Sequence, residues 1–128
     1  MCIRDRLYLW ANVPGVQKFG KFEGNSANDG TYVDLGFRPA LLILKNMDNG
    51  SAPWYMLDNK RSPYNEVVKS IQAQSNGAEA TDSNFVDFLS NGFKMRTSGA
   101  YVNQQTMIYM AWAHQPYHNL YGAQSNAR

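Results

Sequence analysis

Two histidines are the side chains of this sequence best suited to chemistry. His114 and His118 lie four residues apart and are the only histidines. With Asp48 or Asp58 they could begin a metal site, but zinc-type spacing offers no third ligand nearby. A nucleophilic role has no support from motifs, because the sequence contains no Gly-x-Ser-x-Gly elbow and has only one cysteine. We predict no catalytic residue, no metal ion and no cofactor.

The acidic residues give weaker evidence for a functional site than the histidines do. Asp82 and Asp87 could converge as the acid pair of a glycan-cleaving enzyme, which needs two carboxyl groups roughly 5–10 Å apart. Two acidic residues in a chain of 128 residues often converge by chance. Asp48–Ser51 has the start of a calcium loop but lacks the later acidic positions, so a hairpin turn is the preferred interpretation. An enzyme is therefore the least favoured hypothesis.

Aromatic residues carry the clearest remaining signal, with 8 Tyr, 6 Phe and 3 Trp. Trp10, Trp54 and Trp112 fall within strand-like runs and are expected mainly in the core. Tyrosines in amide-rich loops suit adaptable recognition of sugars or proteins, and equally a subunit interface. The candidate surface-binding residues, including both histidines, are Tyr64, Tyr101, His114, Tyr117, His118 and Tyr121.

Composition and charge narrow the class of protein. Charged residues make up only 17% of the chain, and most of its polarity comes from 13 Asn, 9 Ser and 10 Gly. A net charge of +2, with dispersed basic residues, argues against nucleic-acid binding. The most apolar run, residues 40–44, is far shorter than the roughly 20 residues that span a bilayer, so no membrane insertion is expected. A length of 128 residues suits one domain.

Short alternating runs between turn dipeptides predict an all-β fold. Four Asn-Gly or Asp-Gly dipeptides mark tight turns. Residues 40–44 and 106–113 are apolar on both faces, which predicts central strands covered on each side. Residues 84–89 are ambiguous between a strand and a helical turn. We predict one antiparallel β-sandwich of jelly-roll or concanavalin-like type, with strands at 31–37, 40–44, 54–57, 67–73, 93–96 and 106–113.

The start of the chain is predicted to be a remnant. Trp10–Pro14 and Trp112–Pro116 share the pattern Trp-Ala-x-x-Pro, and each follows an apolar, aromatic stretch. Residues 7–17 are therefore interpreted as the end of a preceding repeat or a first strand, with the β-sandwich module at 18–128. Coincidence is the alternative. Residues 1–6 resemble a translated sequencing adapter from a metagenomic assembly and are predicted to be a non-native leader, with a frayed terminus as the alternative.

Two arginines could hold a turn between strands in a fixed conformation by pairing with nearby carboxylates. Gly36 relaxes the chain between two predicted strands, and a proline after Arg38 favours extended geometry there. Arg38 and Arg61 could each pair with Asp34 or Asp58. We interpret this region as a structural corner held by a salt bridge.

Several short blocks are distinctive through their order and spacing. They read KFG at 18–20, GFRPA at 36–40 leading into LILK at 42–45, PYN at 63–65, DFLSNGFK at 87–94 and IYMAWA at 108–113. Through these blocks the chain from Phe19 to Arg128 resembles a domain of unknown function found in tail-fibre and other structural proteins of phages. The resemblance implies a β-sandwich in modular, oligomeric virion proteins, without catalytic residues. The sequence departs from that family at His114, where an acidic residue is usual.

Three hypotheses follow. The first is a virion structural module of a phage tail fibre or related appendage, assembled in the host cytoplasm. It would be a homo-oligomer, a trimer by family analogy, and its loops would bind a host-surface glycan or protein. The second is a stand-alone carbohydrate-binding β-sandwich module. The third is the glycan-cleaving enzyme.

Overall fold

The computed structural model describes residues 7–115, with residues 82–84 described in their backbone only. The predicted leader at 1–6 and the candidates Tyr117, His118 and Tyr121 lie outside the described residues. The strands are β1 (Gln17–Asn25), β2 (Tyr32–Asp34), β3 (Pro39–Asn46), β4 (Tyr55–Asp58), β5 (Val67–Gln72), β6 (Ala80–Leu89), β7 (Gly92–Met95) and β8 (Gln104–Ala113).

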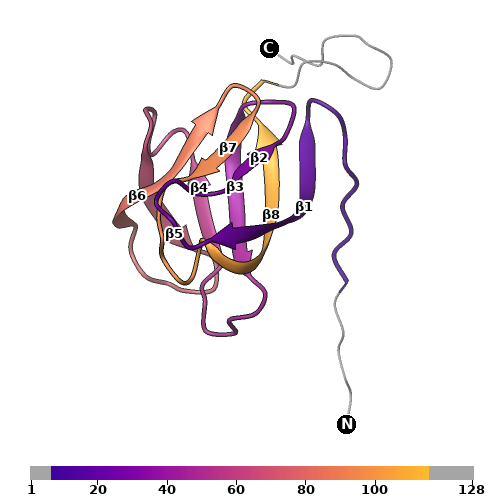
Figure 1. The fold of residues 1–128 in the computed structure, drawn as a ribbon. Coiled ribbons are helices and arrows are strands. Elements are labelled where there is room, and N and C mark those ends of the chain that lie inside the picture. Colours follow the sequence, from indigo (N-terminus) through magenta and orange to yellow (C-terminus); the bar gives the residue numbers. More distant parts are fainter. Residues whose placement is uncertain (1–6, 116–128) are drawn as a thin grey trace.

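All these strands belong to one antiparallel sheet, with the order β1-β8-β3-β4-β5-β6-β7-β2 (Figure 1). The two edge strands, β1 and β2, are consecutive in the chain, so the sheet has to curl until its edges approach each other. Side chains bridge the seam between them. Lys18 Nζ donates to the Asp34 carbonyl oxygen at 2.8 Å, and Thr31 Oγ1 donates to the Glu23 carbonyl oxygen at 2.7 Å.

The predicted all-β, antiparallel, single-domain fold is confirmed. The two layers of the predicted sandwich are opposite walls of one rolled sheet, which forms a nearly closed barrel (Figure 1). The ambiguous segment 84–89 is a strand, because it lies within β6 and pairs with β7. The predicted pairing of residues 40–44 with 54–57 also holds, with Leu42 opposite Leu57.

The core fills the inside of the barrel. Its centre is aromatic, because Phe93 contacts both Phe22 and Tyr109 edge-on, with ring centroids 5.7 and 5.6 Å apart. Burial raises the pKa of the Tyr109 hydroxyl, and the charge of Asp34 raises it further. Around this centre lie fully buried aliphatic and aromatic side chains from four strands: Leu42, Leu44, Leu57, Val86, Phe88 and Met107.

The sequence analysis did not predict β1. Its inward positions alternate Gly20, Phe22 and Gly24, so only one of them carries an apolar side chain. A Cβ at Gly20 would lie 2.7 Å from the Tyr109 hydroxyl oxygen, and a Cβ at Gly24 would lie 2.2 Å from the Asn103 carbonyl carbon. These glycines let β1 approach the core and the neighbouring backbone closely. Because glycine has no side chain, β1 also lacks the alternation of apolar and polar residues by which the other strands were recognised.

The prediction that the tryptophans lie mainly in the core is wrong. Trp10 is 53% exposed, and Trp54 and Trp112 are only half-buried. In β8 the buried side chains are Met107, Tyr109 and Ala111, so Trp112 has the opposite parity and projects outward. A single rolled sheet has one inner face, and the tryptophans lie outside it.

The prediction that β3 and β8 are covered on both faces is also wrong. Both strands are central, because each pairs with a neighbour along both edges. Their inner side chains are buried, whereas the outward Leu41, Ile43, Ile108 and Met110 are only partly buried. The barrel therefore has an apolar outer wall along these strands.

A candidate binding surface at one end of the barrel

The strand directions sort the loops into two groups. Loops 35–38, 59–66 and 90–91 lie at one end of the barrel with residues 114–115, and we call this the His114 end. Loops 26–31, 47–54, 73–79 and 96–103 lie at the opposite end, called the Asn103 end. The structure therefore places Tyr64 and His114 at the same end and Tyr101 at the other.

Tyr64 is exposed to solvent, and the loop that carries it is fixed by hydrogen bonds. Its side chain is 83% exposed. The next residue, Asn65, makes two hydrogen bonds with Phe88: its amide donates to the carbonyl oxygen, and its side-chain oxygen accepts from the backbone N–H, both at 3.0 Å. Ser62 Oγ accepts from the backbone N–H groups of Val68 and Lys69, at 3.3 and 3.2 Å. An aromatic ring on a pre-ordered loop loses little conformational entropy when it binds a partner.

His114 joins three loops at this end. Its backbone N–H donates to the Arg38 carbonyl oxygen at 2.8 Å, and its ring nitrogen Nδ1 lies 2.6 Å from Asn59 Nδ2. This contact links the loop after β4 to the residue that follows β8. A hollow of about 200 Å³ beside the ring is lined by Arg38, Ser90, His114 and Gln115.

Arg38 gives this hollow a cationic group. Of the ion pairs considered from the sequence, Arg61 with Asp58 is confirmed at 3.3 Å. Among the described residues Arg38 has no ion pair within 4 Å, and it is exposed. A guanidinium in this state offers planar, paired donors to a carboxylate or phosphate.

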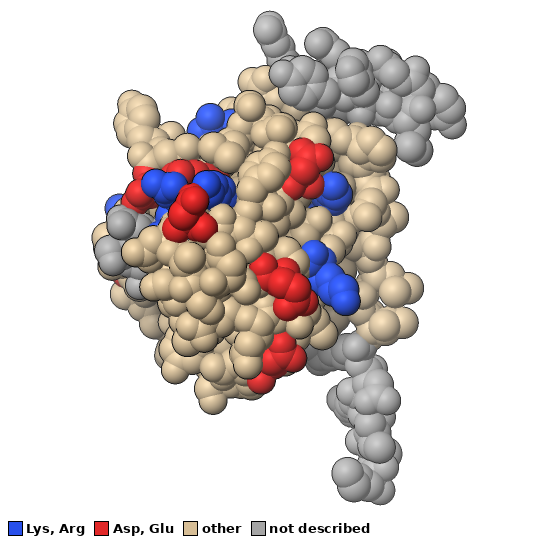
Figure 2. Space-filling model, viewed as in Figure 1, with Lys and Arg blue, Asp and Glu red and all other residues tan. Residues whose placement is uncertain are grey.

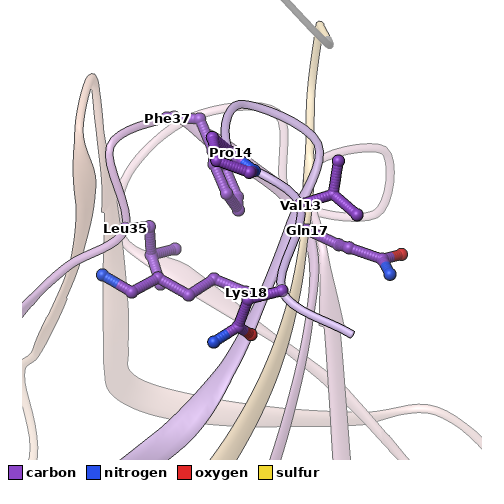
Figure 3. A pocket seen from close by; sticks show the side chains of 7 residues that line it. Val13, Pro14, Gln17, Lys18, Leu35 and Phe37 are labelled. Carbon is purple, nitrogen blue, oxygen red and sulfur yellow. The ribbon is translucent and has the colours of Figure 1, made fainter. Parts of the chain in front are cut away.

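A second hollow at the same end lies where β1 begins. It has a volume of about 250 Å³ and is lined by Asn12, Val13, Pro14, Gln17, Lys18, Leu35 and Phe37 (Figure 3). The turn at Pro14 and Gly15 forms one wall, and Gly15 has a positive φ of 72°. Figure 3 shows the Lys18 side chain extending toward Leu35, and its amine is bound to the Asp34 carbonyl oxygen at 2.8 Å. Apolar walls with one fixed polar group are typical of small-ligand sites.

The Asn103 end is tied together by buried amides. Asn103 Nδ2 donates to Asn25 Oδ1 and to the carbonyl oxygens of Ala27 and Thr97, at 3.0, 2.8 and 2.7 Å. Asn46 is equally buried and holds the loop that follows β3. Tyr101 is 47% exposed on this tied end. Some of the many asparagines therefore do not lie on the surface but hold loops in place from inside the protein.

The charged side chains largely neutralise one another. Figure 2 shows one mixed cluster of charges on the side of β6 and β7 and smaller acidic and basic groups elsewhere, with most of the visible face uncharged. Arg96 lies 3.4 Å from Asp87 and 3.8 Å from Glu66, and Lys69 lies 3.1 Å from Glu79. Lys94 pairs with Asp29 and holds the pKa of that carboxyl below its usual value. Such pairing leaves little long-range electrostatic field around this side of the barrel.

A metal site and a catalytic pair of carboxylates find little support among the described residues. No group of three or more His, Cys, Asp or Glu within residues 7–115 could hold a metal ion. Asp48 lies at the end opposite His114 and accepts from the Thr106 backbone N–H. Asp87 pairs with Arg96, whereas the side chain of Asp82 is outside the description. No helix in the described part of the chain is long and apolar enough to cross a membrane.

Sequence reasoning had identified Tyr64 and His114, but it had missed Asn59 and Ser90 and had treated Arg38 as purely structural. Arg38, Ser90 and His114 come from separate parts of the chain, and only the strand order brings them to one hollow. No local pattern marks them, because loop residues with ordinary turn chemistry look alike in sequence.

Comparison with known proteins gives one match. Neither the curated proteins nor the solved structures contain a match to the chain. One family profile matches residues 6–116, a range that contains all eight strands of the described part. The chain belongs to the family described as a domain of unknown function, DUF7483.

Proposed function

We propose that this domain is a structural module of a phage tail fibre or related appendage, and that its His114 end binds a glycan or protein on the host surface. In this role the rolled sheet is a rigid support and the loops at one end are the contact surface. The domain performs no chemistry of its own. It acts in an oligomeric appendage, so that several weak contacts add up to firm attachment.

The observation that carries this proposal is the placement of Tyr64. Its ring is 83% exposed, while Asn65 beside it is bound twice to Phe88 of β6. The same end holds a hollow lined by Arg38 and His114. An exposed aromatic ring and an unpaired guanidinium at the same end suit surface sugars that carry carboxylate or phosphate groups.

A polysaccharide array tests the proposal. The full chain of 128 residues would be applied to immobilised bacterial capsular polysaccharides and lipopolysaccharides. We expect retention on a subset of acidic polysaccharides, and at least a tenfold loss for Tyr64→Ala, since stacking on one aromatic ring contributes about 1–3 kcal/mol in comparable sites.

Tyr101→Ala is the matched control, because Tyr101 is also an exposed loop tyrosine but lies at the Asn103 end. It should be retained like the unmodified chain. Equal losses for both variants, or no retention of the unmodified chain on any surface polysaccharide or host cell, would contradict the proposal.

A stand-alone carbohydrate-binding module is the second candidate, favoured by the half-buried Trp54 and Trp112 on the outside of the barrel. In that case the sugar would stack on the outer wall rather than on the His114 end. Trp112→Ala would then abolish retention on the array, and Tyr64→Ala would leave it unchanged.

A further inference from the structure

An uninterrupted row of apolar side chains crosses the outer wall of the barrel. The strand register places Met110 opposite both Phe19 and Ile43, and Met56 opposite both Ile43 and Ile71. All five side chains have the outward parity and all are only partly buried. We call these residues the outer row: Phe19, Met110, Ile43, Met56 and Ile71.

The positions beside the outer row mix apolar and polar side chains. On one side Trp112 pairs with Gln17 and with Leu41, which in turn pairs with Asp58. On the other side Ile108 lies between Lys21 and Lys45. An apolar centre with a polar rim is the usual anatomy of a protein–protein interface.

The same chain displays an apolar segment whose side chains are largely exposed. Leu7 and Leu9 are each 81% exposed, and the aromatic residues Tyr8 and Trp10 are also largely exposed. Four consecutive exposed apolar side chains are unfavourable in water and mark an interaction segment. We call residues 7–10 the N-terminal apolar segment.

This segment reaches only the first position of its own outer row. Trp10 stacks on Tyr8 and on Phe19, with centroid distances of 5.9 Å in both cases, and Phe19 contacts Trp112 edge-on at 5.6 Å. Asn12 accepts from the Phe19 backbone N–H at 2.8 Å, and Val13 pairs with Gln17. These contacts direct the segment along the free edge of β1 rather than across the sheet (Figure 1).

The far part of the row is therefore uncovered. The row runs from β1 to β5, four strand spacings or about 19 Å, and its distal members are Met56 and Ile71. Both side chains keep part of their surface exposed to solvent.

We propose that the outer row binds the N-terminal apolar segment of a second copy of this chain. The segment and the row are both apolar and uncharged, and each keeps solvent-exposed apolar surface in the described structure. A surface that is complementary to another part of the same chain joins copies head to tail, so each copy gives one segment and receives one. This inference deepens the proposed function by naming the surface through which copies associate, and it depends on that function only for the expectation of an oligomer.

Sedimentation of the full chain across the micromolar range tests the inference. The unmodified chain should form a species larger than a monomer. Leu9→Asp, in the segment, and Met56→Glu, in the row, should each weaken association at least tenfold, because each places a charge in an apolar contact. Circular dichroism checks that each variant retains its β structure.

Met47→Glu is the matched control, since Met47 is apolar and 59% exposed but lies in the loop after β3, away from the row. It should associate like the unmodified chain. A mixture provides the sharper test. Leu9→Asp keeps an intact row and Met56→Glu keeps an intact segment, so the two together should form a dimer that neither forms alone.

A strictly monomeric full chain, or a mixture that stays monomeric, would overturn the inference. So would variants that change polysaccharide retention without changing mass, because the row would then be a sugar-binding platform. Array binding by a monomeric chain would leave the proposed function intact, whereas association without array binding would leave this inference intact.

Discussion

Asn103 ties loop 26–31 to loop 96–103 with one buried side chain. Its amide nitrogen donates three hydrogen bonds of 3.0 Å or less, to Asn25, Ala27 and Thr97, and its oxygen accepts from the Asn25 backbone N–H at 3.3 Å. Each of these partners would be left without its bond if the side chain were removed. The cost of such buried, unsatisfied groups exceeds the modest gain that each bond gives when formed.

We therefore expect Asn103→Ala to lower the free energy of unfolding by about 3 kcal/mol, since several partners lose their bonds together. Asn28→Ala is the control. Asn28 lies in the same loop region but is exposed and accepts one bond, from the Ser98 backbone N–H. Urea unfolding should show a loss of less than about 1 kcal/mol for this variant. Similar losses for both variants would mean that Asn103 is not an anchor.

At the level of elements, a strand could be predicted from the sequence where its inward-facing side chains are apolar. β3, β7 and β8 present apolar side chains at alternating inner positions, so alternation and turn dipeptides located them. β1 escaped because two of its inner positions are glycines whose places are filled by neighbours. Trp112 was misplaced because the apolar character of both faces of β8 was taken as burial of both faces, although one face belongs to the outer wall.

A substitution in β1 tests this explanation. A Cβ at Gly24 would lie within 2.5 Å of three backbone atoms of Asn103 and Gln104, which cannot rotate away. Gly24→Ala should therefore lower the free energy of unfolding by about 1–3 kcal/mol, the usual cost of overpacking. Gly50→Ala meets nothing within 4 Å and should be neutral or slightly stabilising in thermal unfolding. A neutral Gly24→Ala would show that β1 does not need its glycines.

At the level of the whole molecule, the rolled sheet separates two surfaces. Tyr64 and Arg38 lie at the His114 end, whereas Ile43 and Met56 lie on the outer wall. A module built in this way can associate with copies of itself through its side while its end stays free for another partner.

Composition allowed Tyr64 and His114 to be chosen as candidates, because exposed loops can be recognised from their residues. The hollow between Arg38 and Ser90 could not be predicted in the same way. Its residues come from loops 52 positions apart in the chain, and the order β3 to β7 brings them together only once the sheet has curled. Contacts between distant loops depend on strand order, which local patterns do not encode.

The claim that the His114 end is the contact surface can be mapped by nuclear magnetic resonance. The isotopically labelled full chain would be titrated with the polysaccharide that the array retains most strongly. We predict that amide shifts concentrate in loops 35–38, 59–66 and 90–91, with Tyr64 and Arg38 among them. Shifts concentrated in loops 26–31, 47–54 and 96–103, or on the outer row, would contradict the claim.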